Sequence, residues 1–125
     1  MLMKTLYVFS GKVLRGKKRG RKLGFPTANL KLTQEIPEGI YAAKVSIGRK
    51  KYTAAVFIGA AKTYNETETK AECFILDFSG DIYSRNITIS LYNKIRENRK
   101  FETELELIEQ IEKDVEKIRR FSISM

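Results

Sequence analysis

The stretch GIYAAKVSIGRKKYTAAVFIG, residues 39–59, carries the alternation of residue types that decides the fold. Its first half places Tyr41, Ala43, Val45 and Ile47 on one face and Lys44 and Ser46 on the other. A period of two is typical of a β-strand with one buried face. Arg49 and Lys50 then predict a hairpin turn into a second strand over 51–59. We therefore expect two neighbouring antiparallel strands here.

Segments on both sides of this hairpin predict further strands. NITISLY at 86–92 alternates between Ile or Leu on one face and hydroxyl residues on the other. AECFILDF at 71–78 is followed by a Ser-Gly-Asp turn at 79–81, which leads into the strand over 82–92. Residues 5–14 predict a first strand.

The C-terminal segment follows a helical period instead. Its apolar residues are spaced three or four apart, and they are Leu105, Ile108, Ile111, Val115 and Ile118. Thr103, with Glu106 three residues later, forms a capping box at the start of a helix over about 103–121. About five short strands followed by one helix predict a mainly β protein, a small antiparallel barrel over about 5–92 with the amphipathic helix packed outside it.

Size and charge limit the class of protein. A chain of 125 residues is expected to form a single domain, residues 1–125. It has no run of 18 apolar residues and one cysteine, Cys73, so we expect a cytoplasmic protein with no membrane partner. Of the net charge of +9, residues 1–65 contribute 14 Lys and Arg against 2 acids. This basic half indicates a polyanionic partner, which is either a nucleic acid or the phosphates of a nucleotide.

The basic residues concentrate in a glycine-containing loop. Residues 11–22 hold seven cations, and Gly16, Gly20 and Gly24 are spaced four apart. Glycines allow backbone N–H groups to turn toward an anion. The loop matches neither a Walker A motif nor GxGxxG, so a solvated basic loop or a nucleic-acid patch remains an alternative on this evidence alone.

Three further residues are candidates for chemistry in a chain that has no histidine. Thr27 and Asn29 lie two apart in an extended segment and offer neutral oxygen ligands to Mg²⁺, although a turn that bonds its own backbone would use the same residues. Glu72 shares the parity of Phe74, Leu76 and Phe78, and at the inner end of a barrel strand it would be a desolvated general base. A strand-end Glu paired with a cation is the alternative.

Four stretches, in this order, resemble the riboflavin kinase family, including the kinase module of bacterial bifunctional FAD synthetases. They are GKVLRGKKRGRKLGFPTANL at 11–30, PEGIYAAKV at 37–45, AECFILDFSGDIYS at 71–84 and KIRENRKFETELELIEQIEKD at 94–114. The resemblance runs from about Phe9 to Phe121. It implies a six-stranded antiparallel Greek-key barrel with a C-terminal helix outside it. It also implies transfer of the ATP γ-phosphate to the 5′-hydroxyl of riboflavin to give FMN.

The resemblance also implies roles for particular positions. The nucleotide would be bound by Gly16, Arg21, Lys22, Gly24, Pro26, Thr27 and Asn29. Mg²⁺, which accompanies ATP, would be held by Thr27 and Asn29. Glu72 would be the catalytic base, and Arg96 and Phe101 would lie on the flavin side.

Some positions of the sequence depart from the family pattern, and two other functions remain as alternatives. The chain departs from the family pattern at three positions, Phe57, Lys62 and Ser84. These departures are expected to affect substrate affinity or the choice of nucleotide. No adenylyltransferase domain is present in these 125 residues, so FAD synthesis is not expected. Alternatives are a non-catalytic flavin- or nucleotide-binding module and a basic β-barrel that binds nucleic acid. We expect a monomer with no specific nucleic-acid partner.

Overall fold

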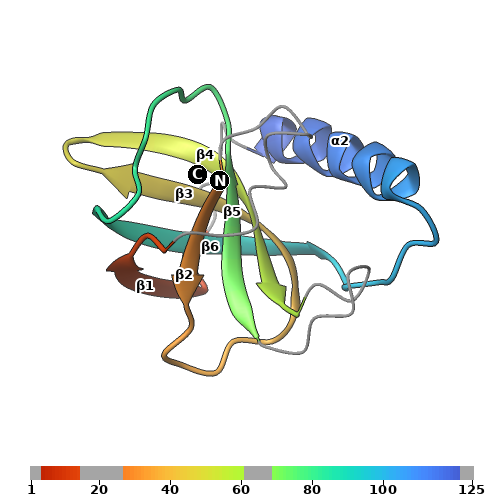
Figure 1. Cartoon of the computed structure of the whole chain (residues 1–125), viewed down its shortest axis with the longest axis horizontal. Coiled ribbons are helices and arrows are strands. Elements are labelled where there is room, and N and C mark those ends of the chain that lie inside the picture. The colour runs from red at the N-terminus through yellow and green to blue at the C-terminus, as the bar shows by residue number, and fades with distance from the viewer. Residues whose placement is uncertain (1–3, 15–26, 61–68, 122–125) are drawn as a thin grey trace.

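The structure is a computed structural model, and it describes residues 4–14, 27–60 and 69–121. Figure 1 shows a curled sheet of six strands with one long helix beside it. The elements, in chain order, are β1 (Tyr7–Lys12), β2 (Thr27–Lys31), β3 (Gly39–Ile47), β4 (Lys50–Gly59), β5 (Lys70–Ile75), β6 (Asn86–Arg96) and α2 (Glu104–Phe121). No helix among the described residues is both long enough and apolar enough to span a membrane.

All strand pairs are antiparallel, and the sheet order is β1-β6-β3-β4-β5-β2. Strands β3, β4 and β5 form consecutive hairpins, and β6 returns to lie beside β3, which is a Greek-key arrangement. The edge strands β1 and β2 approach each other through a bridge between Leu14 and Asn29, where the Leu14 N–H donates to the Asn29 carbonyl oxygen at 2.7 Å. The expected antiparallel Greek-key fold is therefore confirmed, as a sheet curled into a half-barrel.

The concave side of the curled sheet holds the larger hydrophobic core. Alternate residues of every strand contribute to it, among them Phe9, Leu30, Tyr41, Val45, Val56, Cys73, Ile75, Ile89 and Leu91. The faces predicted for the stretches 39–47 and 86–92 are the faces observed. Burial of these side chains is the main favourable contribution to folding of the barrel.

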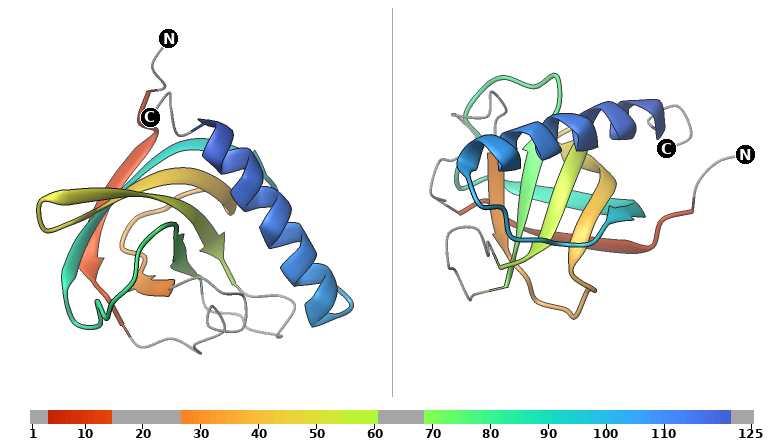
Figure 2. Two further views of the ribbon diagram at one scale, coloured as in Figure 1. Left: turned by 90° about the horizontal axis from the view of Figure 1, so that it is seen from above. Right: turned by 90° about the vertical axis from the view of Figure 1, so that its right-hand side faces the viewer.

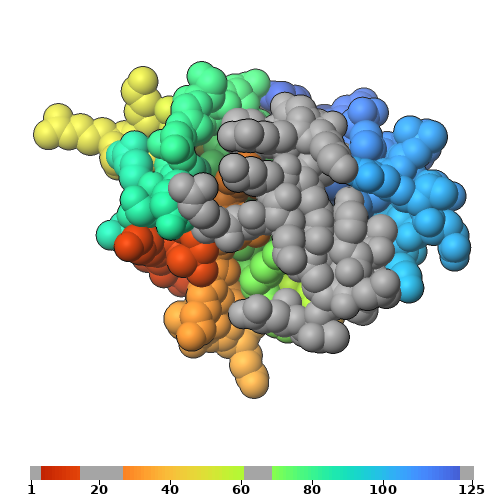
Figure 3. All heavy atoms as spheres, viewed as in Figure 1, coloured from red at the N-terminus to blue at the C-terminus, as the bar shows by residue number. Residues whose placement is uncertain are grey.

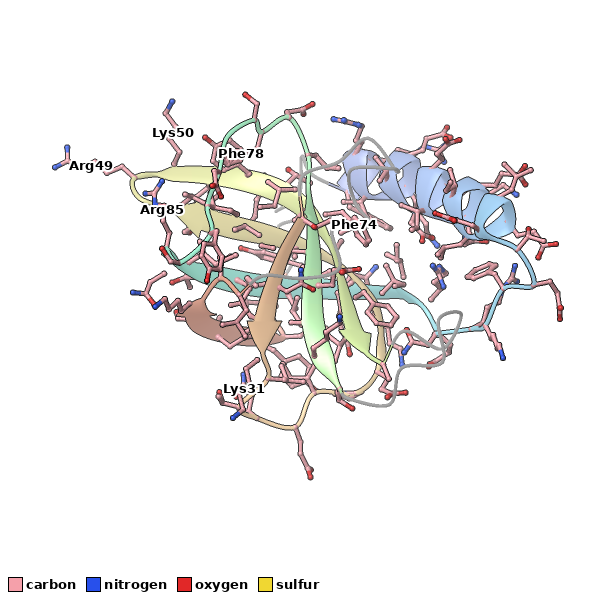
Figure 4. All side chains as sticks on the ribbon, viewed as in Figure 1. Lys31, Arg49, Lys50, Phe74, Phe78 and Arg85 are labelled. Atoms are coloured by element: carbon pink, nitrogen blue, oxygen red, sulfur yellow. The ribbon has the colours of Figure 1, made fainter. Side chains whose placement is uncertain are left out.

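Helix α2 lies across the outside of the curled sheet (Figure 2). It buries Ile111, Val115 and Ile118 against outward-facing residues of the sheet, including Ala42, Ala55 and Phe74. Figure 4 shows Phe74 between β5 and the helix. Thr103 is confirmed as the N-cap of the helix, because the Glu106 N–H donates to its hydroxyl at 3.2 Å. Leu105 departs from the expected apolar stripe, since 64% of it is exposed and Leu107 packs against the cluster instead.

The structure also corrects several predicted boundaries. The β3–β4 turn is formed by Gly48 and Arg49, because Gly48 adopts the left-handed φ of 63° that glycine tolerates. Strand β5 ends at Ile75 and not at Phe78. Strand β6 begins at Asn86 and continues to Arg96, beyond the predicted end at residue 92. Asp77, with a φ of 56°, turns the chain after β5.

Truncation of Ile118 should show how strongly the helix is held to the sheet. Ile118 is fully buried, so Ile118→Ala removes apolar contacts and leaves a cavity. We expect the free energy of unfolding, measured with urea, to fall by about 2–5 kcal/mol. Leu105→Ala, on the exposed side of the same helix, is the matched control and should change it by less than about 0.5 kcal/mol. Equal effects of the two variants would contradict this packing.

Candidate active site

Five residues lie side by side across the sheet, one from each of five neighbouring strands. The register pairs Asn29 with Glu72, Glu72 with Phe57, Phe57 with Ile40, and Ile40 with Arg96. Directly paired residues project from the same face of a sheet. We call these five residues the site row. It brings together three of the predicted site residues, Asn29, Glu72 and Arg96, which are far apart in the sequence.

The site row lies on the outer face of the barrel. The neighbours of Asn29 and Glu72 along their strands, Ala28, Leu30, Ala71 and Cys73, belong to the interior core. Strand residues alternate between the two faces, so Asn29 and Glu72 face outward. The row beside it, which contains Phe74, Ala55 and Ala42, is covered by α2. The site row therefore runs along the margin of the helix-covered surface.

This placement corrects the expected position of Glu72. We expected the carboxylate at the inner end of a barrel strand, but the face that Glu72 shares with Phe74 and Leu76 is the one that packs against α2. Phe78 does not share that face, because its ring stacks on Tyr52 at 5.0 Å, beside the interior core. Both faces of β5 are apolar, for different reasons, and Glu72 is half-buried on the outer one.

Asn29 carries an unusual buried acceptor. Only 6% of the residue is exposed, and its side-chain oxygen Oδ1 is buried without a hydrogen-bond partner. Such a group costs free energy unless a water, an ion or another ligand satisfies it, so Asn29 Oδ1 is a candidate ligand-binding atom. Thr27, two residues earlier on the same face of β2, is half-buried and adds a hydroxyl. The described residues contain no group of three acidic, Cys or His side chains that could hold a metal alone.

Arg96 is held at the opposite end of the site row by Asp114 of α2. Its Nε donates to the Asp114 carboxylate oxygens at 2.9 and 3.0 Å, and its Nη2 donates at 2.8 Å. Register shifts in the pairing of β3 with β6 lie just before Arg96. Ile95 packs in the helix cluster while Arg96 binds Asp114, so two consecutive residues both reach the helix side. A β-bulge permits this, because it interrupts strict alternation.

Phe101, the other residue predicted on the flavin side, is almost fully buried, with 4% exposed. The guanidinium carbon of Arg96 lies 5.8 Å from the centre of its ring, and that of Arg99 lies 4.6 Å from it. These are cation–π distances. Phe101 therefore supports the arginine side chains at this end of the row.

Cys73 is no candidate for chemistry beside Glu72. It points into the barrel core and is fully buried. Burial, and then the nearby Glu72 carboxylate, raise the pKa of its thiol well above the ordinary value. The thiol therefore stays protonated, and the carboxylate of Glu72 is left as the basic group of the site row.

Several predicted positions lie outside the described residues. They are Gly16, Arg21, Lys22, Gly24 and Pro26 of the glycine loop and Lys62 among the departures. Of the other departures, Phe57 lies inside the site row, next to Glu72. Ser84 belongs to the turn before β6, where its φ is 68°.

Our sequence analysis gave no role to three polar residues near the site row, which are Asp114, Gln110 and Asn98. The Gln110 side chain donates to Asp114 Oδ1 at 3.0 Å. Asn98 donates to the Ile58 carbonyl oxygen at 3.2 Å, and its own Oδ1 is buried without a partner. Only Asp114 left a signal in the sequence, because it is an acid among Ile111, Val115 and Ile118 on the apolar stripe.

A separate pocket of about 850 Å³ contains none of the predicted site residues. It is lined by Tyr7, Thr69 and residues 32–38 of the β2–β3 connection. This connection is tied to the barrel by Tyr41, whose hydroxyl donates to the Pro37 carbonyl oxygen at 2.6 Å. Burial is the main cause that raises the pKa of the Tyr41 hydroxyl, which favours this donor role.

Comparison with known proteins places this chain in a family. A family model described as riboflavin kinase, or flavokinase, matches residues 3–122. The bifunctional riboflavin kinase/FMN adenylyltransferase of Bacillus subtilis (strain 168) is 40% identical over 129 residues, which cover 98% of this chain and 41% of that protein. The chain thus spans less than half the length of this relative.

Two solved structures share the fold. The crystal structure of riboflavin kinase from Trypanosoma brucei is 26% identical, with a TM-score of 0.63 and coverage of 90% of this chain and 77% of that chain. A structure described as a macrolide-efflux protein from Streptococcus pneumoniae is 36% identical, with a TM-score of 0.80 and coverage of 92% and 39%. With the match of the family model over nearly its whole length, this chain belongs to the riboflavin kinase family.

Proposed function

We propose that this chain is a riboflavin kinase, which transfers the γ-phosphate of ATP to the 5′-hydroxyl of riboflavin and gives FMN and ADP. Family membership supports this function. The observation that carries it is the site row, in which the unpartnered Asn29 oxygen lies opposite Glu72 while Arg96 stands at the far end. Phosphoryl transfer needs alignment and charge neutralisation more than covalent help, and this set supplies both.

The length and polarity of the row suit riboflavin. Glu72 and Arg96 are separated by three strand spacings, about 14 Å along the sheet. Phe57 and Ile40 lie between them and form an apolar floor. A substrate with a flat ring at one end and a polyhydroxyl chain at the other matches this order. We place its 5′-hydroxyl at Glu72 and its ring toward Arg96 and Phe101.

Glu72 is proposed to act as the general base. As the 5′-oxygen forms its bond to the γ-phosphorus, the bond from that phosphorus to the β–γ bridging oxygen breaks and ADP leaves. The hydroxyl proton passes to the Glu72 carboxylate. The half-buried outer face, with Phe57 on one side and Asn29 on the other, holds the carboxylate beside the reacting hydroxyl.

Mg²⁺ fits the oxygen atoms at the Asn29 end of the row. A neutral amide oxygen without another partner and a nearby hydroxyl are hard ligands of the kind that Mg²⁺ accepts. We propose that Asn29 and Thr27 hold the ion together with nucleotide phosphate oxygens. Bound there, the ion would neutralise charge that develops on the phosphates. Gly16, Arg21, Lys22, Gly24 and Pro26 are proposed to surround those phosphates.

The proposed partners are therefore small molecules, and nucleic acid is not among them. Single-stranded nucleic acid is usually bound by exposed aromatic side chains in a basic groove. Among the described residues Tyr83, at 44%, is the one aromatic residue more than about a third exposed. Arg49, Lys50 and Arg85 lie near one another beside the β3–β4 turn, and Lys31 lies apart from them at the end of β2 (Figure 4). The β3–β4 turn extends beyond the rest of the surface (Figure 3). A monomeric state and a cytoplasmic location belong to the same proposal.

Incubation with riboflavin and MgATP tests the proposal directly. We expect the purified chain to form FMN, detected by chromatography, and to lose this activity when EDTA removes the metal. Glu72→Gln protein purified in the same way controls for a kinase carried over from the expression host. Flavin binding without FMN formation, with ATP or any other nucleoside triphosphate, would favour the non-catalytic alternative.

A further inference from the structure

Two polar side chains are buried among the described residues, and they flank the site at its two ends. One is Asn29, at the nucleotide end of the site row. The other is Asp114 of α2, with 4% of the residue exposed, which binds Arg96 at the opposite end. Burial of a carboxylate carries a large desolvation penalty, so its position next to Arg96 calls for an explanation beyond helix packing.

The contacts of Arg96 leave one part of its guanidinium for another group. Nε and Nη2, on one side of the fork, are taken up by Asp114. Nη1 donates to the Glu97 carbonyl oxygen at 3.1 Å. Arg has five N–H donors, so these contacts leave one on Nη1 and one on Nη2. The side chain of Arg96 is 18% exposed, so it is not fully enclosed by the protein.

Helix attachment alone does not account for the buried pair. The helix already packs through Ile111, Val115 and Ile118. A second ion pair joins it to the barrel, because Arg119 donates to the Asp77 carboxylate at 2.9 Å on the exposed surface. Replacing a buried ion pair by apolar residues is often neutral or stabilising. Stability therefore gives no reason to bury Asp114 beside Arg96.

We propose that Asp114 is a positioning residue for the flavin ring. It fixes the guanidinium of Arg96, itself braced by Phe101, so that the remaining N–H pair binds the carbonyl oxygens of the ring. Gln110 holds the carboxylate in turn. Arginine suits this role better than lysine because its donors form a rigid planar fork. The inference rests on the proposed function. It adds that α2, through Asp114, contributes to the recognition of riboflavin as the phosphate acceptor.

A double-mutant cycle tests this role, with Asp114→Asn, Arg96→Met and the two combined. Loss of the charge-assisted bidentate contact should raise the KM for riboflavin roughly tenfold or more in each single variant. The KM for ATP should stay within about twofold. If Asp114 acts through Arg96, the double variant should be no worse than Arg96→Met alone, since the two effects are not additive. Asp77→Asn, which breaks the surface pair on the same helix, is the control and should leave both KM values unchanged.

FMN affinity, measured by quenching of flavin fluorescence, and thermal unfolding complete the test. We expect affinity to fall in parallel with the rise in the riboflavin KM. If Asp114→Asn fails to fold, the double variant decides, because it no longer contains an unpaired buried charge. A double variant with wild-type riboflavin KM and FMN affinity would show that the pair is only structural. Equal increases in both KM values would also overturn the proposal. If the wild-type chain makes no FMN, the proposed function itself has failed.

Discussion

Glu72→Gln is expected to lower kcat by about 10²- to 10⁴-fold, the usual contribution of general-base assistance. This range corresponds to about 3–5 kcal/mol in the activation barrier. The substitution keeps the shape of the side chain and its position opposite Asn29, but an amide cannot take the hydroxyl proton. The KM values for ATP and riboflavin should therefore change little. Steady-state kinetics with chromatographic detection of FMN measure all three quantities.

Thermal unfolding of the same variant separates this role from a structural one. An ion-pair role for Glu72 predicts a lower Tm and a kcat within a few fold of the wild-type value. Glu109→Gln, an exposed acid on α2, is the matched control for loss of one negative charge. A stable Glu72→Gln protein with near-normal turnover would rule out Glu72 as the base.

Much of the fold could be predicted because several strands carry their own pattern. The alternation over 39–47 and 86–92 and the N-cap at Thr103 are local signals, and the structure confirms them. The sequence of β5 does not show which of its two faces points into the barrel. Its residues are apolar on both faces, since one face fills the barrel and the other meets α2. The prediction that Glu72 shares a face with Phe74 and Leu76 is therefore confirmed. The prediction that it lies at the inner end of a barrel strand is wrong.

The site row itself could not be derived from sequence patterns. It depends on the register of four strand pairs and on the bulge before Arg96. Neither is fixed by the residues of a single strand. The family resemblance named Asn29, Glu72 and Arg96, but it gave no reason for their order along one face. That order follows from the Greek-key topology, which brings β6 beside β3.

The absence of a partner for the Asn29 oxygen is the feature that most directly indicates a ligand. A buried acceptor left unsatisfied typically destabilises a protein by about 1–3 kcal/mol. A turn former, which was the alternative interpretation of Thr27 and Asn29, would satisfy its side chain locally. In the structure the side-chain oxygen of Asn29 has no hydrogen-bond partner. Its geometry therefore supports a role toward a bound ion over a role in the backbone turn.

Asn29→Ala should accordingly raise the Mg²⁺ concentration needed for half-maximal activity by roughly ten- to a hundredfold, the range seen when groups that support metal sites are altered. Stability of the metal-free protein should be unchanged or slightly higher, because the substitution removes a buried acceptor that has no hydrogen-bond partner. A Mg²⁺ titration of FMN formation, together with thermal unfolding of the metal-free protein, measures both effects. Thr33→Ala, an exposed hydroxyl in the β2–β3 connection, is the control and should keep the wild-type metal dependence. An Asn29→Ala protein with wild-type metal dependence and a clearly lower Tm would show that Asn29 only supports the strand, since removal of a ligand must weaken metal use whatever it does to the fold.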